Sequence, residues 1–431
     1  MTERESPFTV TVDLNPYLAE GATDVDAIVT VTATDALAAP DPDAVEVLII
    51  DCSASMTGEK LEAARHACAA AIAELRDGVH FAVVEGTHTA IQVFPAGGGT
   101  VAADDTSRAA AGMAIGQLVA HGGTAIGSWL RLAAQLVDRH PGAIKHAILL
   151  TDGHNQHEDE PTFRAALDAC RDRFGCDCRG VGTDWRVAEL RMVTNALLGS
   201  VDIVADPDDL AADFRALMDA AMAKAVPEVA LRLWTPKDAA VRFVKQVSPS
   251  IADLTDRRTD LDPLRGEYPL GAWGAESRDY HVGVRVPAGA VGEERLAARF
   301  TLVTGPSGET LGSGRAVVSW TADSTLSTRL NPAVAGYTGQ AELAEAIQEG
   351  LAARKAGDER TATARLGRAV ALADAAGNTE TARLLAKVVD VLDAPTGTVR
   401  LRKAVAAADE MTLDTRSTRT VRVRARPEEP E

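Results

Sequence analysis

Three polar side chains at alternate positions follow an apolar run near residue 50. The run spans residues 45–50, and the polar residues are Asp51, Ser53 and Ser55. A buried strand that ends in D-x-S-x-S brings its carboxylate to the carboxyl edge of a sheet, where open α/β folds bind their ligands. One carboxylate and two hydroxyls are hard oxygen ligands, which suit Mg²⁺, Mn²⁺ or Ca²⁺ better than zinc or copper.

The same serines are also good helix N-caps, because a helix is expected to begin near Gly58. The D-x-S-x-S motif alone therefore leaves two interpretations open, a cation site and a helix-capping cluster.

Two further segments favour the cation site, because both lie where a strand-to-helix turn is expected. The first is Gly122-Gly123-Thr124, a flexible turn before an amphipathic helix. The second is the apolar run of residues 147–150, which continues into Thr151-Asp152-Gly153. Thr124 thus adds a hydroxyl and Asp152 adds a carboxylate.

D-x-S-x-S, then G-G-T, then an apolar strand ending in T-D-G resembles the metal-ion-dependent adhesion site of von Willebrand factor type A domains. The resemblance covers residues 44–225, and Ala54 stands where many members have glycine. It implies a divalent cation, usually Mg²⁺, held by the residues of the five motif positions: Asp51, Ser53, Ser55, Thr124 and Asp152.

Such a site is incomplete, because Mg²⁺ prefers six oxygens and keeps waters where the protein offers none. The resemblance implies that an Asp or Glu of a partner protein replaces one of these waters. A binding protein is therefore expected, and an enzyme is not.

The sequence around the motifs predicts an α/β fold with a doubly wound, mostly parallel sheet, because apolar strands alternate with amphipathic helices. The expected strands span residues 45–51, 79–85, 89–94, 144–151, 177–182 and 201–204. The expected helices span residues 58–77, 105–120, 125–139, 160–174, 186–198 and 207–224.

The flanking regions have a different pattern. Residues 226–325 show period-two runs separated by turns, which predict an antiparallel β-sandwich. Residues 1–40 contain two alternating strands that need partners, because a lone hairpin is marginal in water. We expect them to join the sandwich, so that the domain of residues 44–225 is an insertion; the rival is a separate N-terminal extension of the sheet edge.

Helical periodicity returns in residues 336–394, which predict three antiparallel helices, and residues 395–431 are expected to form a partly disordered tail. The order of these regions resembles multidomain bacterial type A proteins of the cytoplasm, by architecture only.

Composition limits the possible classes of partner and the possible cellular compartment. The net charge of −18 argues against nucleic acid or an anionic membrane as the main partner. No apolar run is long enough to span a bilayer, and no targeting signal is visible at the N-terminus. Five cysteines without a C-x-x-C pair favour a reducing compartment, so the expected location is the cytoplasm.

Several residues outside the motifs have side chains that could bind a metal or a ligand. Cys176 and Cys178 form a C-x-C pair that is expected to pack in a strand. His154 and His157 follow Asp152 and either contact a ligand or face solvent, while Trp129 and Trp185 serve packing or the rim of the site.

Two other functions stay open beside partner binding. One is an accessory subunit of an ATPase-driven chaperone or chelatase, although the chain has no G-x-x-x-x-G-K-S/T loop. The other is a metal-assisted hydrolase, in which Asp51 and Asp152 would hold Mg²⁺ beside an activated water. The hydrolase lacks an evident base.

Overall fold

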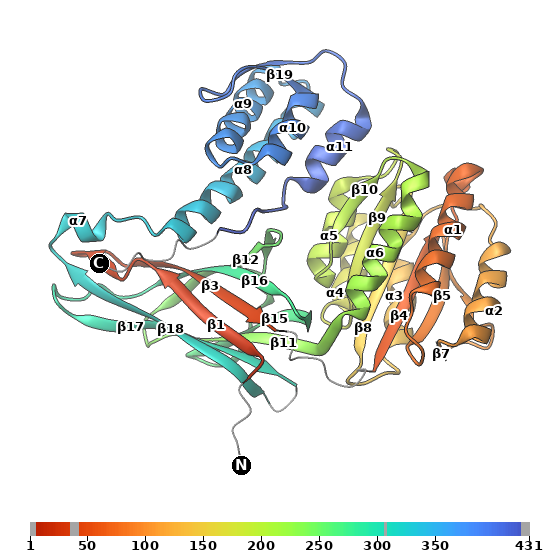
Figure 1. Ribbon diagram of the computed structural model, residues 1–431, viewed down its shortest axis with the longest axis horizontal. Helices are drawn as coiled ribbons and strands as arrows, with labels where there is room; N and C mark the ends of the chain where they lie inside the picture. The colour runs from red at the N-terminus through yellow and green to blue at the C-terminus, as the bar shows by residue number, and fades with distance from the viewer. Residues whose placement is uncertain (1–5, 35–42, 306–307, 424–431) are drawn as a thin grey trace. The chain divides into compact units, whose positions relative to one another are not determined.

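The computed structural model describes residues 6–34, 43–305 and 308–423. The described chain divides into two compact units (Figure 1). One unit consists of residues 43–228 and 271–274, and the other of residues 6–34, 229–270, 275–305 and 308–423.

The first unit contains a sheet in which five parallel strands are flanked by two antiparallel ones. The strand order is β10-β9-β8-β4-β5-β6, and β7 also pairs with β5. The strands are β4 (Ala44–Asp51), β5 (His80–Gly86), β6 (Ala90–Phe94), β7 (Val101–Ala102), β8 (Ile144–Thr151), β9 (Gly175–Val181) and β10 (Val201–Val204). This arrangement confirms the predicted doubly wound α/β fold with a mostly parallel sheet. At one edge, β5 and β6 form an antiparallel hairpin.

Helices cover both faces of this sheet (Figure 1). They are α1 (Glu59–Ala73), α2 (Asp105–Gly116), α3 (Ile126–Val137), α4 (Glu160–Cys170), α5 (Val187–Leu197) and α6 (Leu210–Met222). Every residue of β4 is buried, and alternate residues such as Leu48 and Ile50 share one core with α1, α2 and α6. Since β4 is covered on both faces, its sequence up to Asp51 is apolar except for Glu46.

The second unit is built on two β-sheets. One has the order β1-β3-β16-β12-β13 and the other β14-β15-β11-β17-β18-β2, in which β2 and β18 are parallel. The strands of the first sheet are β1 (Phe8–Leu14), β3 (Asp24–Ala33), β12 (Ala240–Ser248), β13 (Ala252–Asp253) and β16 (Ser277–Arg285). Those of the second are β2 (Tyr17–Ala19), β11 (Lys224–Trp234), β14 (Thr259–Asp262), β15 (Arg265–Gly274), β17 (Glu294–Thr304) and β18 (Glu309–Thr321).

The two N-terminal strands belong to the first of these sheets. β1 pairs with β3, and β3 pairs antiparallel with β16 from Asp24↔Arg285 to Thr32↔Ser277. The chain thus leaves this sheet after β3, forms the first unit, and then enters the other sheet of the second unit at β11. In the sequence, the first unit is therefore inserted between two strands of the second.

The C-terminal part of the second unit is helical, with a small hairpin. Its elements are α7 (Ser324–Ser327), α8 (Pro332–Lys355), α9 (Glu359–Ala375), α10 (Thr379–Val388), β19 (Val389–Asp393), β20 (Thr398–Leu401) and α11 (Ala407–Arg416). Gly357 and Gly377 have positive φ and are each followed by a residue, Asp358 or Asn378, whose side chain caps the next helix.

The expected three helices followed by a tail are therefore too few elements for this region. Residues 395–431 contain β20 and α11 within their described part, and residues 424–431 lie outside the described residues. α11 was missed because only Leu413 and Thr415 of its side chains are buried, which leaves almost no apolar period to detect. Leu413 packs with α8, α9 and α10 in one core.

In residues 6–34, 43–305 and 308–423, no helix is both long enough and apolar enough to cross a bilayer. All five cysteines are free thiols with buried side chains.

Candidate metal centre

Neighbouring strands bring the two motif aspartates to the same edge of the sheet. β4 pairs in parallel with β8, with Ile50 opposite Leu150, so that Asp51 and Thr151-Asp152 end at one level. Asp51 and Asp152 are both fully buried. These strand ends lie close together because β4 and β8 are parallel and in register.

The turn after β4 folds back so that its backbone contacts the Asp51 carboxylate. The Ser53 amide donates to Asp51 Oδ1 over 2.7 Å, and a short 3₁₀ turn at Ala54–Met56 follows. Gly58 then has φ 75°, a left-handed conformation that favours glycine, and α1 begins at Glu59. Neither Ser53 nor Ser55 caps α1, because its N-cap is Gly58 and no side chain bonds there. The helix-capping interpretation of the serines is therefore wrong.

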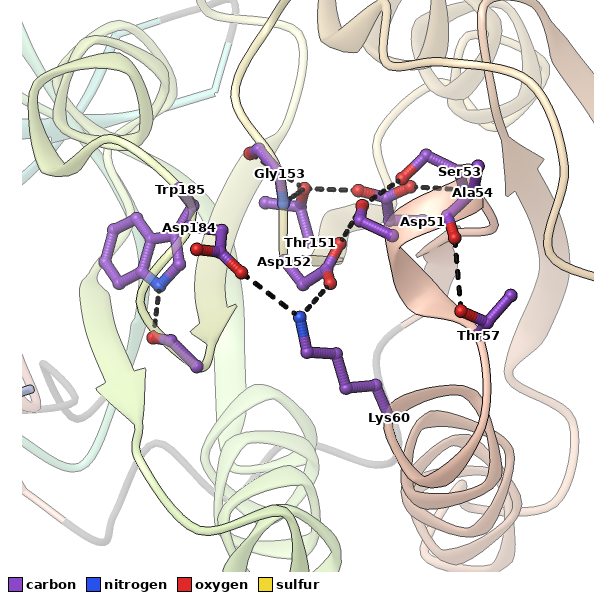
Figure 2. Close-up of polar contacts among 12 residues, drawn as sticks. Asp51, Ser53, Ala54, Thr57, Lys60, Thr151, Asp152, Gly153, Asp184 and Trp185 are labelled. Carbon is purple, nitrogen blue, oxygen red and sulfur yellow. Dashed lines mark hydrogen bonds and ion pairs between the residues drawn. The ribbon is translucent and has the colours of Figure 1, made fainter.

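The hydroxyls connect the two carboxylates in a chain of hydrogen bonds (Figure 2). Ser53 Oγ lies 3.0 Å from Ser55 Oγ, and Ser55 Oγ donates to Asp152 Oδ1 over 2.6 Å. On the other side, Thr151 Oγ1 donates to Asp51 Oδ2 over 2.5 Å.

Thr124 joins the same group of oxygens. A Cβ placed on Gly153 would lie 3.2 Å from Thr124 Oγ1, 3.6 Å from Ser55 Oγ and 3.8 Å from Asp51 Oδ2. Two oxygens from residues 51–55 and one from Thr124 thus surround one small space, which the absence of a side chain at Gly153 leaves open. All five residues of the motif are therefore brought together.

The donor set fits a hard divalent cation. Within the described residues, no three His, Cys, Asp or Glu side chains form a metal-binding group, so a cation here would depend on hydroxyls as well as on two carboxylates. Such oxygen-only sets suit Mg²⁺ or Ca²⁺ and not a soft metal. Burial raises the pKa of Asp51 to about 6, although hydrogen bonds from Thr151 and Ser53 act against this rise. A nearby cation would relieve that cost of burial.

Lys60 supplies a positive charge at this edge. Its Nζ contacts Asp152 Oδ2 at 2.5 Å and Asp184 Oδ2 at 3.5 Å (Figure 2). Burial alone would lower the pKa of Lys60, but the two carboxylates outweigh this effect and raise it. One oxygen of Asp152 thus faces Ser55 and the other faces an ammonium group.

Lys60 and Thr151 belong to this site but are not among the five residues that the motifs predict. Thr151 is part of the T-D-G motif. Its position directly before Asp152 indicates that its hydroxyl also lies at this edge of the sheet. Lys60 lies in the first turn of α1, where acidic side chains are usually preferred. A lysine at this position therefore indicates a nearby negative charge.

The loop after β8 caps α3, the helix that follows Thr124. Asn155 Oδ1 accepts from the Ile126 amide over 3.1 Å, and Glu158 Oε2 accepts from the Gly127 amide over 2.7 Å. α3 has no cap from its own N-cap residue, Ala125. These contacts hold the loop of Asp152 against the loop of Thr124.

The histidines and tryptophans singled out in the sequence have separate roles. His157 is exposed, and its Nδ1 accepts from the Thr124 amide over 3.2 Å, whereas His154 is half-buried. Trp129 and Trp185 are buried, and their indole groups donate to backbone carbonyls of Thr87 and Gly182. Both tryptophans therefore serve packing.

The C-x-C pair packs within the sheet. Cys176 and Cys178 lie in β9 with no exposed surface. They belong to no metal-binding group among the described residues.

Known proteins are similar to this chain in both fold and sequence. A family model for the von Willebrand factor type A domain matches residues 46–203, and one for the von Willebrand factor type A C-terminal domain matches residues 371–417. The solved structure of a von Willebrand factor type A protein from Catenulispora acidiphila is 49% identical, with a TM-score of 0.93, over 98% of this chain and 99% of that chain. The chain belongs to the von Willebrand factor type A family.

More distant relatives share less. The crystal structure of the ArnB paralog VWA2 from Sulfolobus acidocaldarius is 13% identical, with a TM-score of 0.58, over 96% of this chain and 98% of that chain, which shows a shared fold. A Synechocystis protein described as uncharacterized is 29% identical over 213 residues, 48% of this chain. The match spans 49% of that relative, about half its length. Domains of this family commonly mediate metal-dependent protein interactions.

Proposed function

We propose that this chain binds a protein partner through a divalent cation, Mg²⁺ in the first instance, and that it works as a cytoplasmic binding protein or scaffold and not as an enzyme. The cation is held by Asp51, Ser53, Ser55, Thr124 and Asp152, and an Asp or Glu of the partner completes its coordination.

One observation carries this proposal. Oxygens of Thr124, Ser55 and Asp51 surround the small space beside Gly153 at an edge of the sheet. Ser55 is exposed while Asp51 is buried, so the site has a protein side and a solvent side. A cation with ligands on one side keeps waters on the other, and a carboxylate can replace one of them.

The first test is metal binding by Asp51→Ala and by a matched pair of hydroxyl variants. Titration calorimetry with MgCl₂ should show that Asp51→Ala abolishes binding and that Ser55→Ala weakens it about tenfold, because a ligand oxygen is lost. Thr57→Ala is the control, since Thr57 is also exposed and its hydroxyl donates to the Ala54 carbonyl, away from the proposed ligands. Equal Mg²⁺ affinity of Ser55→Ala and Thr57→Ala would contradict the ligand set.

Partner binding is tested by capture from a cell extract with and without Mg²⁺. A partner retained by the wild type with Mg²⁺, and lost with EDTA or in Asp51→Ala, supports the bridge. If the partner is captured equally well with EDTA and by Asp51→Ala, it binds to another surface of the protein. Loss of the whole fold in Asp51→Ala, seen by circular dichroism, would show a structural metal instead.

A further inference from the structure

A pocket lies on the second unit, on the outer face of the sheet that contains β11 and β17. Its volume is about 480 Å³, and its lining residues are Arg232, Trp234, Arg265, Arg299 and Thr301. The neighbouring residues along these strands, such as Leu233 and Phe300, are buried in the sandwich core. Side chains alternate along a strand, so the lining residues face away from that core.

Three side chains form a row across adjacent strands beside this pocket. Trp234 of β11 is opposite Arg299 of β17, and Arg299 is opposite Arg315 of β18. Both arginines are exposed, and neither guanidinium has an ion pair or a side-chain hydrogen bond with any residue in the described part of the chain. Like charges directly opposite each other on a sheet are unfavourable unless an anion lies between or above them.

The other two arginines each form an ion pair with one carboxylate. Arg232 pairs with Glu267 at 2.6 Å, and Arg265 pairs with Asp262 at 2.6 Å. These four arginines thus have two carboxylate partners, Glu267 and Asp262, in a chain whose net charge is −18. A local basic surface on an acidic protein attracts anions to that place and not to the rest of the molecule.

We propose that this pocket binds a small phosphate-bearing ligand with an aromatic ring, a nucleoside diphosphate or triphosphate. Guanidinium groups bind phosphate oxygens in a bidentate manner, and several of them suit the multiple charges of a polyphosphate better than the single charge of a carboxylate. The indole of Trp234 provides a flat surface on which a base stacks. The volume lies within the range of small-ligand sites.

Titration calorimetry of the full chain with ADP, ATP and pyrophosphate tests this proposal. We expect ADP and ATP to bind, Arg299→Ala and Arg315→Ala each to weaken binding about tenfold, and the affinity to fall as NaCl is raised. Trp234→Ala should weaken the binding of ADP more than the binding of pyrophosphate, because only ADP has a base that stacks on the indole. Arg285→Ala is the matched control, an exposed strand arginine of the other sheet that pairs with Asp24.

Three results would overturn the proposal. They are no binding of any phosphate compound, equal affinities for ADP and pyrophosphate that are unchanged in Trp234→Ala, and binding of an oligoglutamate peptide in place of the nucleotides. All variants change exposed or half-buried side chains, and circular dichroism checks that each remains folded. Binding of MgCl₂ at the candidate metal centre is measured separately, so a failure here leaves that site untouched.

Discussion

Lys60 places a fixed positive charge beside the candidate metal ligands. Its Nζ contacts Asp152, whose carboxylate is fully buried, while the lysine side chain is 28% exposed. In the absence of a divalent ion, the ammonium group compensates a buried carboxylate. In its presence, the two cations repel each other across Asp152.

Lys60→Met should therefore raise the Mg²⁺ affinity several-fold and lower the stability of the metal-free protein by about 2 kcal/mol. Calorimetry with MgCl₂ and thermal melting with and without Mg²⁺ measure the two effects. Lys237→Met, which removes an exposed lysine, is the charge-matched control. A lower Mg²⁺ affinity in Lys60→Met would show that the lysine orients Asp152 for the metal and does not compete with it.

At the scale of elements, the parallel strands are also joined by a charged cluster away from the metal edge. His146 of β8 bonds to Glu46 of β4 at 2.9 Å and to Asp177 of β9 at 2.9 Å. Burial alone would lower the pKa of His146, but the two carboxylates outweigh it and raise the pKa to about 10. The same contacts hold the pKa of Asp177 well below its usual range despite burial.

His146→Gln should lower the free energy of unfolding by about 3 kcal/mol at neutral pH, because two carboxylates lose their cationic partner. A raised folded-state pKa gives stability that is complete below the unfolded value near 6.5 and is lost as pH rises through about 10. Urea unfolding at pH 6, 8 and 10 should show the difference between wild type and His146→Gln shrinking with pH. A difference that grows with pH would mean that His146 is neutral in the folded protein.

At the scale of the whole molecule, the two units differ in how they depend on the N-terminal strands. β3 contributes nine pairs to β16, from Asp24 to Thr32, whereas the first unit has its own sheet and core. Tyr337 of α8 also donates to Asp279 of β16, which accepts from Thr30 of β3 over 2.7 Å. The helix α8 thus contacts the sandwich where β3 pairs with β16, and the bonded residues Thr30 and Asp279 lie 249 residues apart in the sequence.

Deletion of residues 1–34 should unfold the second unit, since β16 would lose β3, one of its two partner strands, and a sheet edge would become exposed. A fragment of residues 43–228 should still fold and bind Mg²⁺. Circular dichroism, limited proteolysis and MgCl₂ calorimetry on both proteins check this. A deletion variant whose protease resistance equals that of the full chain would contradict the dependence of the sandwich on β3.

The candidate site could be predicted only in part. Asp51, Ser53 and Ser55 are close in sequence, and the turns that carry Thr124 and Asp152 are recognisable from local composition. Thr151 and Lys60 were missed because their partners Asp51 and Asp152 lie 100 and 92 residues away. Contacts at such separations depend on the register of strands and not on any local pattern.

The sequence by itself determined the strands and helices of the type A domain, because alternation and helical period are local properties of apolar residues. It also determined the type of ligand atoms in the site, since hydroxyls and carboxylates are properties of single residues. Only the tertiary structure decided that Lys60 faces Asp152, that α11 packs through Leu413, and that Arg299 stands opposite Arg315. Each of these depends on which segments pair in space, and that is set by the burial of the whole core and not by neighbours along the chain.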